Sequence, residues 1–192
     1  MMYRLEADAP KSLQATRDGR SSSASRFTSF DPACLSSGLD VGRKCMDHLE
    51  YPPLDVWEKR REWFESTEAR ARGEGSYFTS EQACALTADV QACFCAGAWT
   101  AVVIVSMAVV DAALRETEVP GFRGDTKQLI RAAGANPKLQ AMRKRRNALV
   151  HFDPDAPALT VDQQWEDRAA LETEAREAVE LMFEAFYIGP WV

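Results

Sequence analysis

The sequence predicts an all-α protein built as a bundle of four or five helices. No long stretch alternates between apolar and polar residues as a half-exposed strand would. After residue 54, capping residues and Gly or Pro stops bracket a series of helix-length segments. At 192 residues and 46% hydrophobic content, the chain is long enough to bury a core without disulfides.

The N-terminal part, residues 1–54, is predicted to be an irregular or partly disordered leader before a helical domain at residues 55–188. It contains a serine-rich run at residues 21–25 and several prolines, with a short strand or turn near residues 26–30 as its only expected order. It begins without an apolar signal segment, and none of the five cysteines forms a C-x-x-C pair. These features predict a cytoplasmic protein with reduced thiols.

The first two helices are expected on either side of a glycine break. Asp55 is the predicted N-cap of a helix over residues 55–72, which Gly73 ends. Thr79 or Ser80 is expected to cap a long helix that runs to about Glu118, kinked at Gly97.

Three further helices are expected in the second half of the chain. The first covers residues 125–133. Asn136 is the predicted N-cap of the next, with Pro137 at its first position and its end near Phe152. The last runs from residues 160–162 to about Tyr187.

Residues 92–110 carry no charge, and this length is the minimum for a membrane span. The segment is rich in small residues and lacks a flanking cluster of Lys or Arg, so we expect no membrane span. A helix that is apolar on all sides also suits the centre of a bundle. Asp111 follows this segment directly. We expect it either to be a buried acid that pairs with Arg146 or a backbone group, or to position Arg146 or His151.

Charge is sorted along the chain. The net charge of −6 argues against a surface that is basic overall, as binding to long nucleic acids would favour. Residues 126–152 contain no acid, whereas residues 162–184 are mostly acidic among their charges. The two segments either pair within the bundle or leave one local anion-binding surface.

The helix over residues 139–152 carries the candidate site. At about 100° per residue, Arg146 falls at about 340° from Leu139, within the apolar stripe that Met142, Leu149 and Val150 define. Arg143, Asn147 and His151 share one edge of this stripe.

An arginine on an apolar face requires a carboxylate, a phosphate or a subunit boundary. One interpretation is that Arg146 pairs with an acid of the last helix, while His151 merely ends its own helix. The other is a site for RNA cleavage, because arginine binds phosphate and histidine transfers protons. The chain has two histidines, His48 and His151, and scattered cysteines, so we expect no metal site and no cofactor.

The sequence Arg146-Asn147-Ala148-Leu149-Val150-His151 resembles the Rx4–6H motif of HEPN domains (higher eukaryotes and prokaryotes nucleotide-binding). The lead-in at residues 139–144 and the Ala-rich segment that ends at Asp111 are also similar to that family. The resemblance covers about residues 55–187 and leaves out the leader.

The resemblance implies a homodimer in which two such motifs face each other and, in active members, metal-independent RNA cleavage. It would make His151 the general acid–base, Arg146 the phosphate ligand and Asn147 a residue that orients the histidine or bonds the phosphate. It also implies a toxin or phage-defence role, with a nucleotidyltransferase-type antitoxin or another defence protein as partner. Neighbouring cations are expected to bind RNA phosphates: Arg143, Lys144 and Arg145. The alternative is a non-catalytic HEPN-like module that binds a partner protein or a nucleotide.

Overall fold

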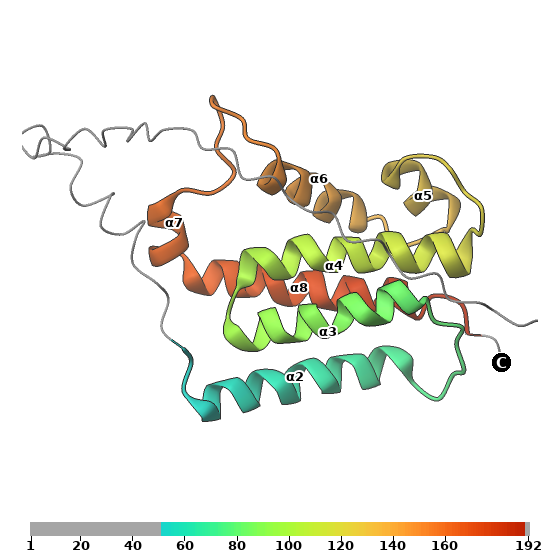
Figure 1. Cartoon of the computed structure of the whole chain (residues 1–192), viewed down its shortest axis with the longest axis horizontal. Coiled ribbons are helices and arrows are strands. Elements are labelled where there is room, and N and C mark those ends of the chain that lie inside the picture. Colours follow the sequence, from blue (N-terminus) through green and yellow to red (C-terminus); the bar gives the residue numbers. More distant parts are fainter. Residues whose placement is uncertain (1–50, 191–192) are drawn as a thin grey trace, which may run out of the picture. The chain divides into compact units, whose positions relative to one another are not determined.

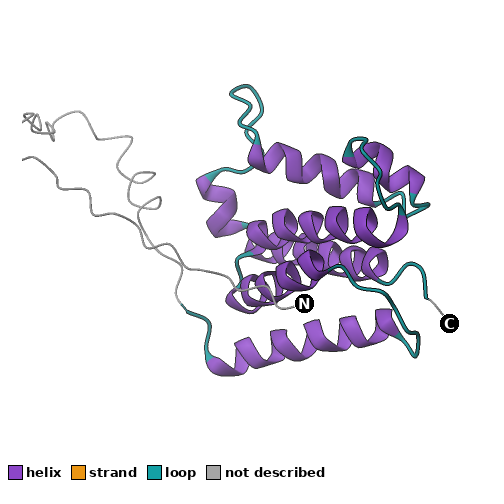
Figure 2. Cartoon of the chain, turned by 45° about the vertical axis from the view of Figure 1, so that its right-hand side comes forward, coloured by secondary structure: helices purple, strands orange, loops and turns teal. Residues whose placement is uncertain are grey.

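The computed structural model describes residues 51–190, and all of its regular structure in that range is helical (Figures 1 and 2). The all-α prediction is therefore confirmed. The elements are α2 (Leu54–Arg72), α3 (Glu81–Ala96), α4 (Trp99–Ala113), the π-helical segment η2 (Leu114–Glu118), α5 (Thr126–Ala132), α6 (Leu139–Val150), α7 (Val161–Glu166) and α8 (Arg168–Phe186). The predictions for the leader, and His48 with them, lie outside the described residues.

Helix α4 is the central element of the bundle. It packs against α3, α8 and α6, while α2 covers α3 and α8 from the opposite side (Figure 1). Its buried side chains include Val102, Met107 and Val110. The prediction of a buried helix is confirmed for residues 99–110, whereas residues 92–98 end α3 and form the break before α4. Within residues 51–190, no helix has the length and apolar character needed to cross a membrane.

The predicted long helix over residues 80–118 is wrong, because Gly97 breaks it rather than kinking it. Gly97 adopts the left-handed conformation (φ 76°, ψ 25°), which ends α3, and α4 begins at Trp99. The break turns the chain back, so that α3 and α4 pack side by side. Glycine adopts this conformation without the steric cost that a Cβ atom would bring.

Two arginines hold this turn. Arg60 of α2 donates to the Cys95 carbonyl (3.1 Å), and Arg168 of α8 donates to the Gly97 carbonyl. Both guanidinium groups also lie over the Trp99 ring, at 4.6 and 5.6 Å from its centroid. They therefore satisfy carbonyls at the end of α3 that the helix itself cannot pair. Burial, and then the charge of Arg60, lower the pKa of Arg168.

The predicted last helix is also two helices. Thr160 caps α7 in a capping box with Gln163, and this confirms the predicted start. Asp167 then leaves helical geometry (φ −98°, ψ 26°), and α8 begins with Arg168. The position of this break brings the Arg168 side chain to the turn at Gly97. The seven α-helices within residues 51–190 exceed the predicted four or five mainly because of these two breaks.

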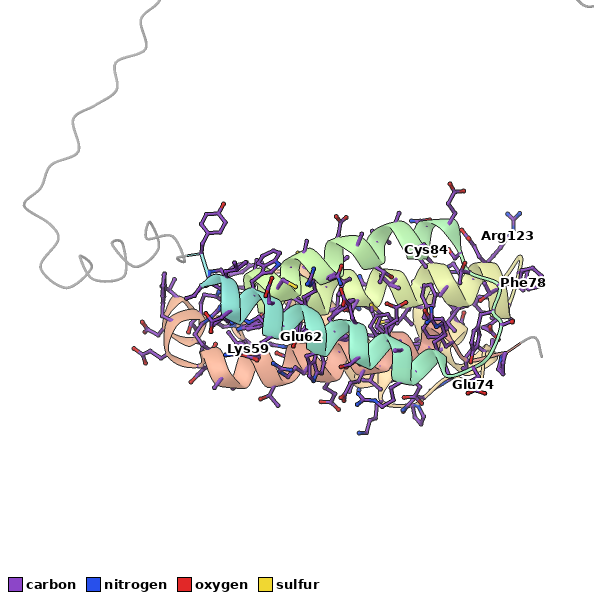
Figure 3. The ribbon with its side chains drawn as sticks, turned by 90° about the horizontal axis from the view of Figure 1, so that it is seen from below. Lys59, Glu62, Glu74, Phe78, Cys84 and Arg123 are labelled. Atoms are coloured by element: carbon purple, nitrogen blue, oxygen red, sulfur yellow. The ribbon has the colours of Figure 1, made fainter. Side chains whose placement is uncertain are left out.

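The other helix ends agree in part with those predicted from the sequence. Ser80 caps α3, and Asp125 caps α5 in a capping box with Gln128, as expected from their side-chain oxygens. The N-cap of α2 is Pro53 and not Asp55, which lies in the first turn and pairs with Lys59 (3.2 Å). Figure 3 shows Lys59 on the exposed side of α2.

Candidate functional site

Helix α6 starts one turn after its predicted cap and ends two residues early. The Leu139 amide donates to the Asn136 carbonyl (3.0 Å) in a tight turn that precedes the helix. Leu139 and Met142 are buried as predicted, but Val150 is 44% exposed. The predicted apolar stripe is therefore wrong at Val150, because the last turn of α6 lies beyond the core that covers its beginning.

Arg146 lies half-buried on α6 and lines an open hollow of about 410 Å³, which we call the Arg146 hollow. Its apolar wall consists of Ile104, Ala108, Ala112 and Val150. Its polar groups come from five elements: Gln82, Asp111, Arg115, Glu116, Thr126 and Arg146. Figure 3 shows Arg123, which precedes α5, at the same end of the bundle as Phe78 and Cys84, which flank the start of α3. The residues that line the hollow belong to α3, α4, η2, α5 and α6, so the hollow lies where these elements meet.

Asp111 pairs with Arg115 and Thr126, and not with Arg146. One Asp111 oxygen accepts from Arg115 Nε (2.6 Å), and the other accepts from the Thr126 hydroxyl (2.7 Å) and Arg115 Nη2 (3.3 Å). Arg115 also donates to the carbonyls of Phe122 and Gly124. The hydrogen bond to Asp111 raises the pKa of the Arg115 guanidinium. This network ties the loop before α5 to the end of α4.

Arg115 and Glu116 belong to the π-helical segment that continues α4. The wider turn changes the direction in which side chains leave the helix, and such segments recur at functional sites. Both side chains reach the Arg146 hollow. Sequence reasoning did not find Arg115, Glu116, Thr126 or Gln82. The i, i+4 spacing of Asp111 and Arg115 was a signal for the first of these.

Arg145 and not Arg146 pairs with the last helix. Its Nε lies 2.7 Å from a Glu174 oxygen, and its Nη1 donates to the Ala158 carbonyl (2.7 Å). Lys138 likewise lies 3.7 Å from Glu177. The prediction that the basic and acidic segments pair within the bundle is confirmed for these two cations.

Arg146 has no such partner. Within residues 51–190, no carboxylate or other protein group forms a hydrogen bond or ion pair with its guanidinium. The interpretation that pairs Arg146 with an acid of the last helix is therefore wrong. The half-buried guanidinium keeps its donors available to a ligand in the hollow.

Two further cations of α6 lie outside the ion pairs of the described residues. Arg143 is half-buried and donates to the Gln140 side chain (3.2 Å), while Lys144 is exposed. Gln140 in turn donates to the Lys127 carbonyl (2.9 Å), which links α6 to α5. Both cations therefore carry uncompensated positive charge on the α6 surface.

His151 is the C-cap of α6, and its side chain is exposed. Its backbone is extended (φ −114°, ψ 116°), and its amide donates to the Asn147 carbonyl (2.9 Å). The Asn147 side chain is half-buried, and Phe152 is 86% exposed. The motif therefore places Arg146 at the hollow, Asn147 beside it and His151 at the solvent-facing end of the same helix.

The described residues contain no group of three or more His, Cys, Asp or Glu side chains arranged to hold a metal ion. The side chains of the motif at the end of α6 supply a guanidinium, an amide and an imidazole. Comparison of the chain with models of protein families, with curated proteins and with solved structures finds no match.

Proposed function

We propose that the protein is a HEPN-type, metal-independent endoribonuclease whose site is formed by Arg146, Asn147 and His151. The observation that carries this proposal is the unpaired guanidinium of Arg146, since the neighbouring Arg145 is neutralised by Glu174. The guanidinium faces an open hollow and none of its donors is used by a protein group in the described range, so a ligand or a second subunit can bind it. An RNA phosphate is such a ligand, and His151 lies exposed on the same helix.

The proposed reaction is an intramolecular transesterification of RNA. The 2′-hydroxyl loses its proton to a neutral imidazole and attacks the phosphorus, and the bond from phosphorus to the 5′-oxygen breaks. The leaving oxygen takes up a proton from an imidazolium, which yields a 2′,3′-cyclic phosphate and a 5′-hydroxyl end. His151 transfers these protons, and Arg146 stabilises the negative charge on the phosphoryl oxygens. Asn147 orients the imidazole or bonds the phosphate.

A homodimer through the end of α6 is part of the proposal. Val150 and Phe152 are exposed apolar side chains on either side of His151. Burying them against a second copy would bring two histidines and two Arg146 side chains to one cleft. Arg143 and Lys144 would lie close to an RNA backbone that entered this cleft, whereas Arg145 is already engaged by Glu174.

The decisive experiment is incubation of the full chain with labelled tRNA and mRNA, with and without EDTA. Wild-type protein should cleave in both conditions and leave 2′,3′-cyclic phosphate ends. His151→Ala and Arg146→Ala should each abolish cleavage. Arg61→Ala is the matched control, because Arg61 lies exposed on α2 and, among residues 51–190, pairs only with Glu65 of the same helix. Cleavage that EDTA abolishes, or that survives His151→Ala, would refute the proposal.

A non-catalytic HEPN-like module that binds a partner protein or a nucleotide is the second candidate. It is favoured by the His151 side chain, since no hydrogen bond to another residue in the described range orients it. Sedimentation and nucleotide titration of a wild-type protein that cleaves no RNA would test this candidate. With either function, we propose a cytoplasmic location. We also propose that the partner is a nucleotidyltransferase-type antitoxin or another defence protein.

A further inference from the structure

The Arg146 hollow has the size of a small-molecule subsite. Its volume of about 410 Å³ falls within the range of about 300–1,000 Å³ that is usual for ligand pockets. One wall is apolar, formed by Ile104, Ala108 and Ala112 of α4, and Val150 closes it from α6. An apolar wall with polar groups around it suits a ring that has polar edges.

The charges of the lining balance. Arg115 and Arg146 contribute two positive charges, and Asp111 and Glu116 contribute two negative ones. Because these charges cancel, the lining as a whole exerts little net attraction on a free phosphate. The hollow as a whole therefore favours a neutral polar ligand over a multiply charged anion.

Only some of the polar groups are free to bind such a ligand. Both Asp111 oxygens are occupied by Arg115 and Thr126. Arg115 is itself held by Asp111 and two backbone carbonyls. Arg146, Glu116 and the Gln82 amide have no hydrogen bond or ion pair to any residue between 51 and 190. The hollow therefore offers one set of strong donors and one strong acceptor.

We propose that the Arg146 hollow binds a nucleobase and prefers guanine. An arginine can donate two hydrogen bonds to O6 and N7 of guanine, and a carboxylate such as that of Glu116 accepts from its N1–H and amino groups. Adenine offers one bond to each partner, and uracil has no amino group. The inference rests on the proposed function for its biological ligand, a guanine next to the cleaved phosphate of RNA. Arg146 would then lie between the base and the phosphate.

The first test uses nucleosides, which carry no phosphate. Guanosine, adenosine, cytidine, uridine and inorganic phosphate are titrated separately into the full chain and followed by NMR chemical shifts. Guanosine should bind at least about tenfold more tightly than uridine, since a bidentate pair discriminates by roughly this factor or more. Inorganic phosphate binding that equals or exceeds guanosine binding, or equal binding of all four nucleosides, would overturn the proposal.

Two variants test the location. Ala108→Leu places a larger side chain at the apolar wall, and it should weaken guanosine binding at least tenfold. Ala88→Leu is the matched control, because Ala88 is exposed on α3 and does not line the Arg146 hollow. Glu116→Gln should remove the guanosine preference, because an amide cannot accept from both guanine donors. Guanosine binding that Ala108→Leu leaves unchanged would place the site elsewhere and refute the inference.

An RNA experiment separates this inference from the proposed function. Oligoribonucleotides that differ at one position next to the cleavage site are incubated with wild-type protein and with Ala108→Leu. Wild type should cleave fastest beside guanine, and the variant should lose that preference. Cleavage with no base preference in either protein refutes the base subsite and leaves the ribonuclease standing. Guanosine binding without cleavage of any RNA supports the base subsite, assigns it to free nucleotides, and refutes the ribonuclease.

Discussion

Two neighbouring arginines should respond in opposite ways to replacement by alanine. Arg145 forms a bidentate ion pair with Glu174, from Nε to Oε1 (2.7 Å) and from Nη2 to Oε2 (3.2 Å). It also donates to the Ala158 carbonyl. The exposed fractions of the two side chains, 30% and 33%, place the pair between the surface and the interior. Arg146 forms no comparable contact within the described part of the chain.

The expected destabilisation follows from these contacts. Exposed ion pairs contribute about 0.2–1 kcal/mol, and buried hydrogen bonds to charged groups contribute about 1.5–3 kcal/mol. A half-exposed pair should lie between them, so Arg145→Ala should lower the free energy of unfolding by about 1–2 kcal/mol. For a domain of this size the melting temperature should fall by about 2–8 °C. Arg146→Ala should change the free energy by less than about 0.5 kcal/mol.

Thermal melts followed by circular dichroism measure both variants, and the RNA assay is run on the same samples below the transition. Arg145→Ala should retain cleavage per folded molecule, whereas Arg146→Ala should lose it. Glu174→Ala alone, and combined with Arg145→Ala, completes a double-mutant cycle that isolates the pair. An Arg146→Ala variant that melts as low as Arg145→Ala would refute the reasoning, because Arg146 would then stabilise the fold rather than bind a ligand.

Three other outcomes are expected. Gly97→Ala should cost about 1–2 kcal/mol, since the left-handed backbone disfavours a side chain and the new Cβ would lie 2.9 Å from Arg60 Nη1; an unchanged melting curve would contradict this. His151→Ala should lower the melting temperature by no more than about 4 °C, because an exposed helix-terminal histidine contributes only about 0.3–1 kcal/mol, and calorimetry at neutral pH checks it. Iodoacetamide should label Cys84 before Cys95 in the native protein, because Cys84 is exposed whereas burial raises the pKa of the Cys95 thiol. Peptide mapping after brief labelling measures this order, and labelling of Cys95 first would contradict the prediction.

The helix ends illustrate what local sequence determines. Ser80, Asp125 and Thr160 cap their helices with side-chain oxygens, and each cap was predictable because donor and acceptor lie within three residues of one another. The uncharged segment likewise predicted a buried helix, because only the interior of a bundle accommodates a helix that is apolar on all sides. The all-α architecture and these three N-caps are therefore determined by local sequence.

Breaks within helices depended on more distant contacts. A glycine can continue a helix at modest cost or end it, and Gly97 ends α3 where Arg60 and Arg168 are at hand to pair the released carbonyls. Those arginines come from α2 and α8, far away in sequence. The propensity of residues 92–101 alone could not distinguish a kink from a complete turn.

The candidate site divides in the same way. The spacing of Arg146 and His151 and the helix signals around them predict one helix that carries both residues, and the structure has Arg146 in α6 and His151 at its C-cap. Packing against α8 places Glu174 beside Arg145 and leaves Arg146 unpaired within the described residues, whereas the pair of Asp111 and Arg115 has the local i, i+4 spacing. Several cations on one helix have nearly equal local environments, and the approach of α8 in space decides which of them pairs with a carboxylate. Local patterns fix the helix, and packing fixes which of its charges remain free to bind.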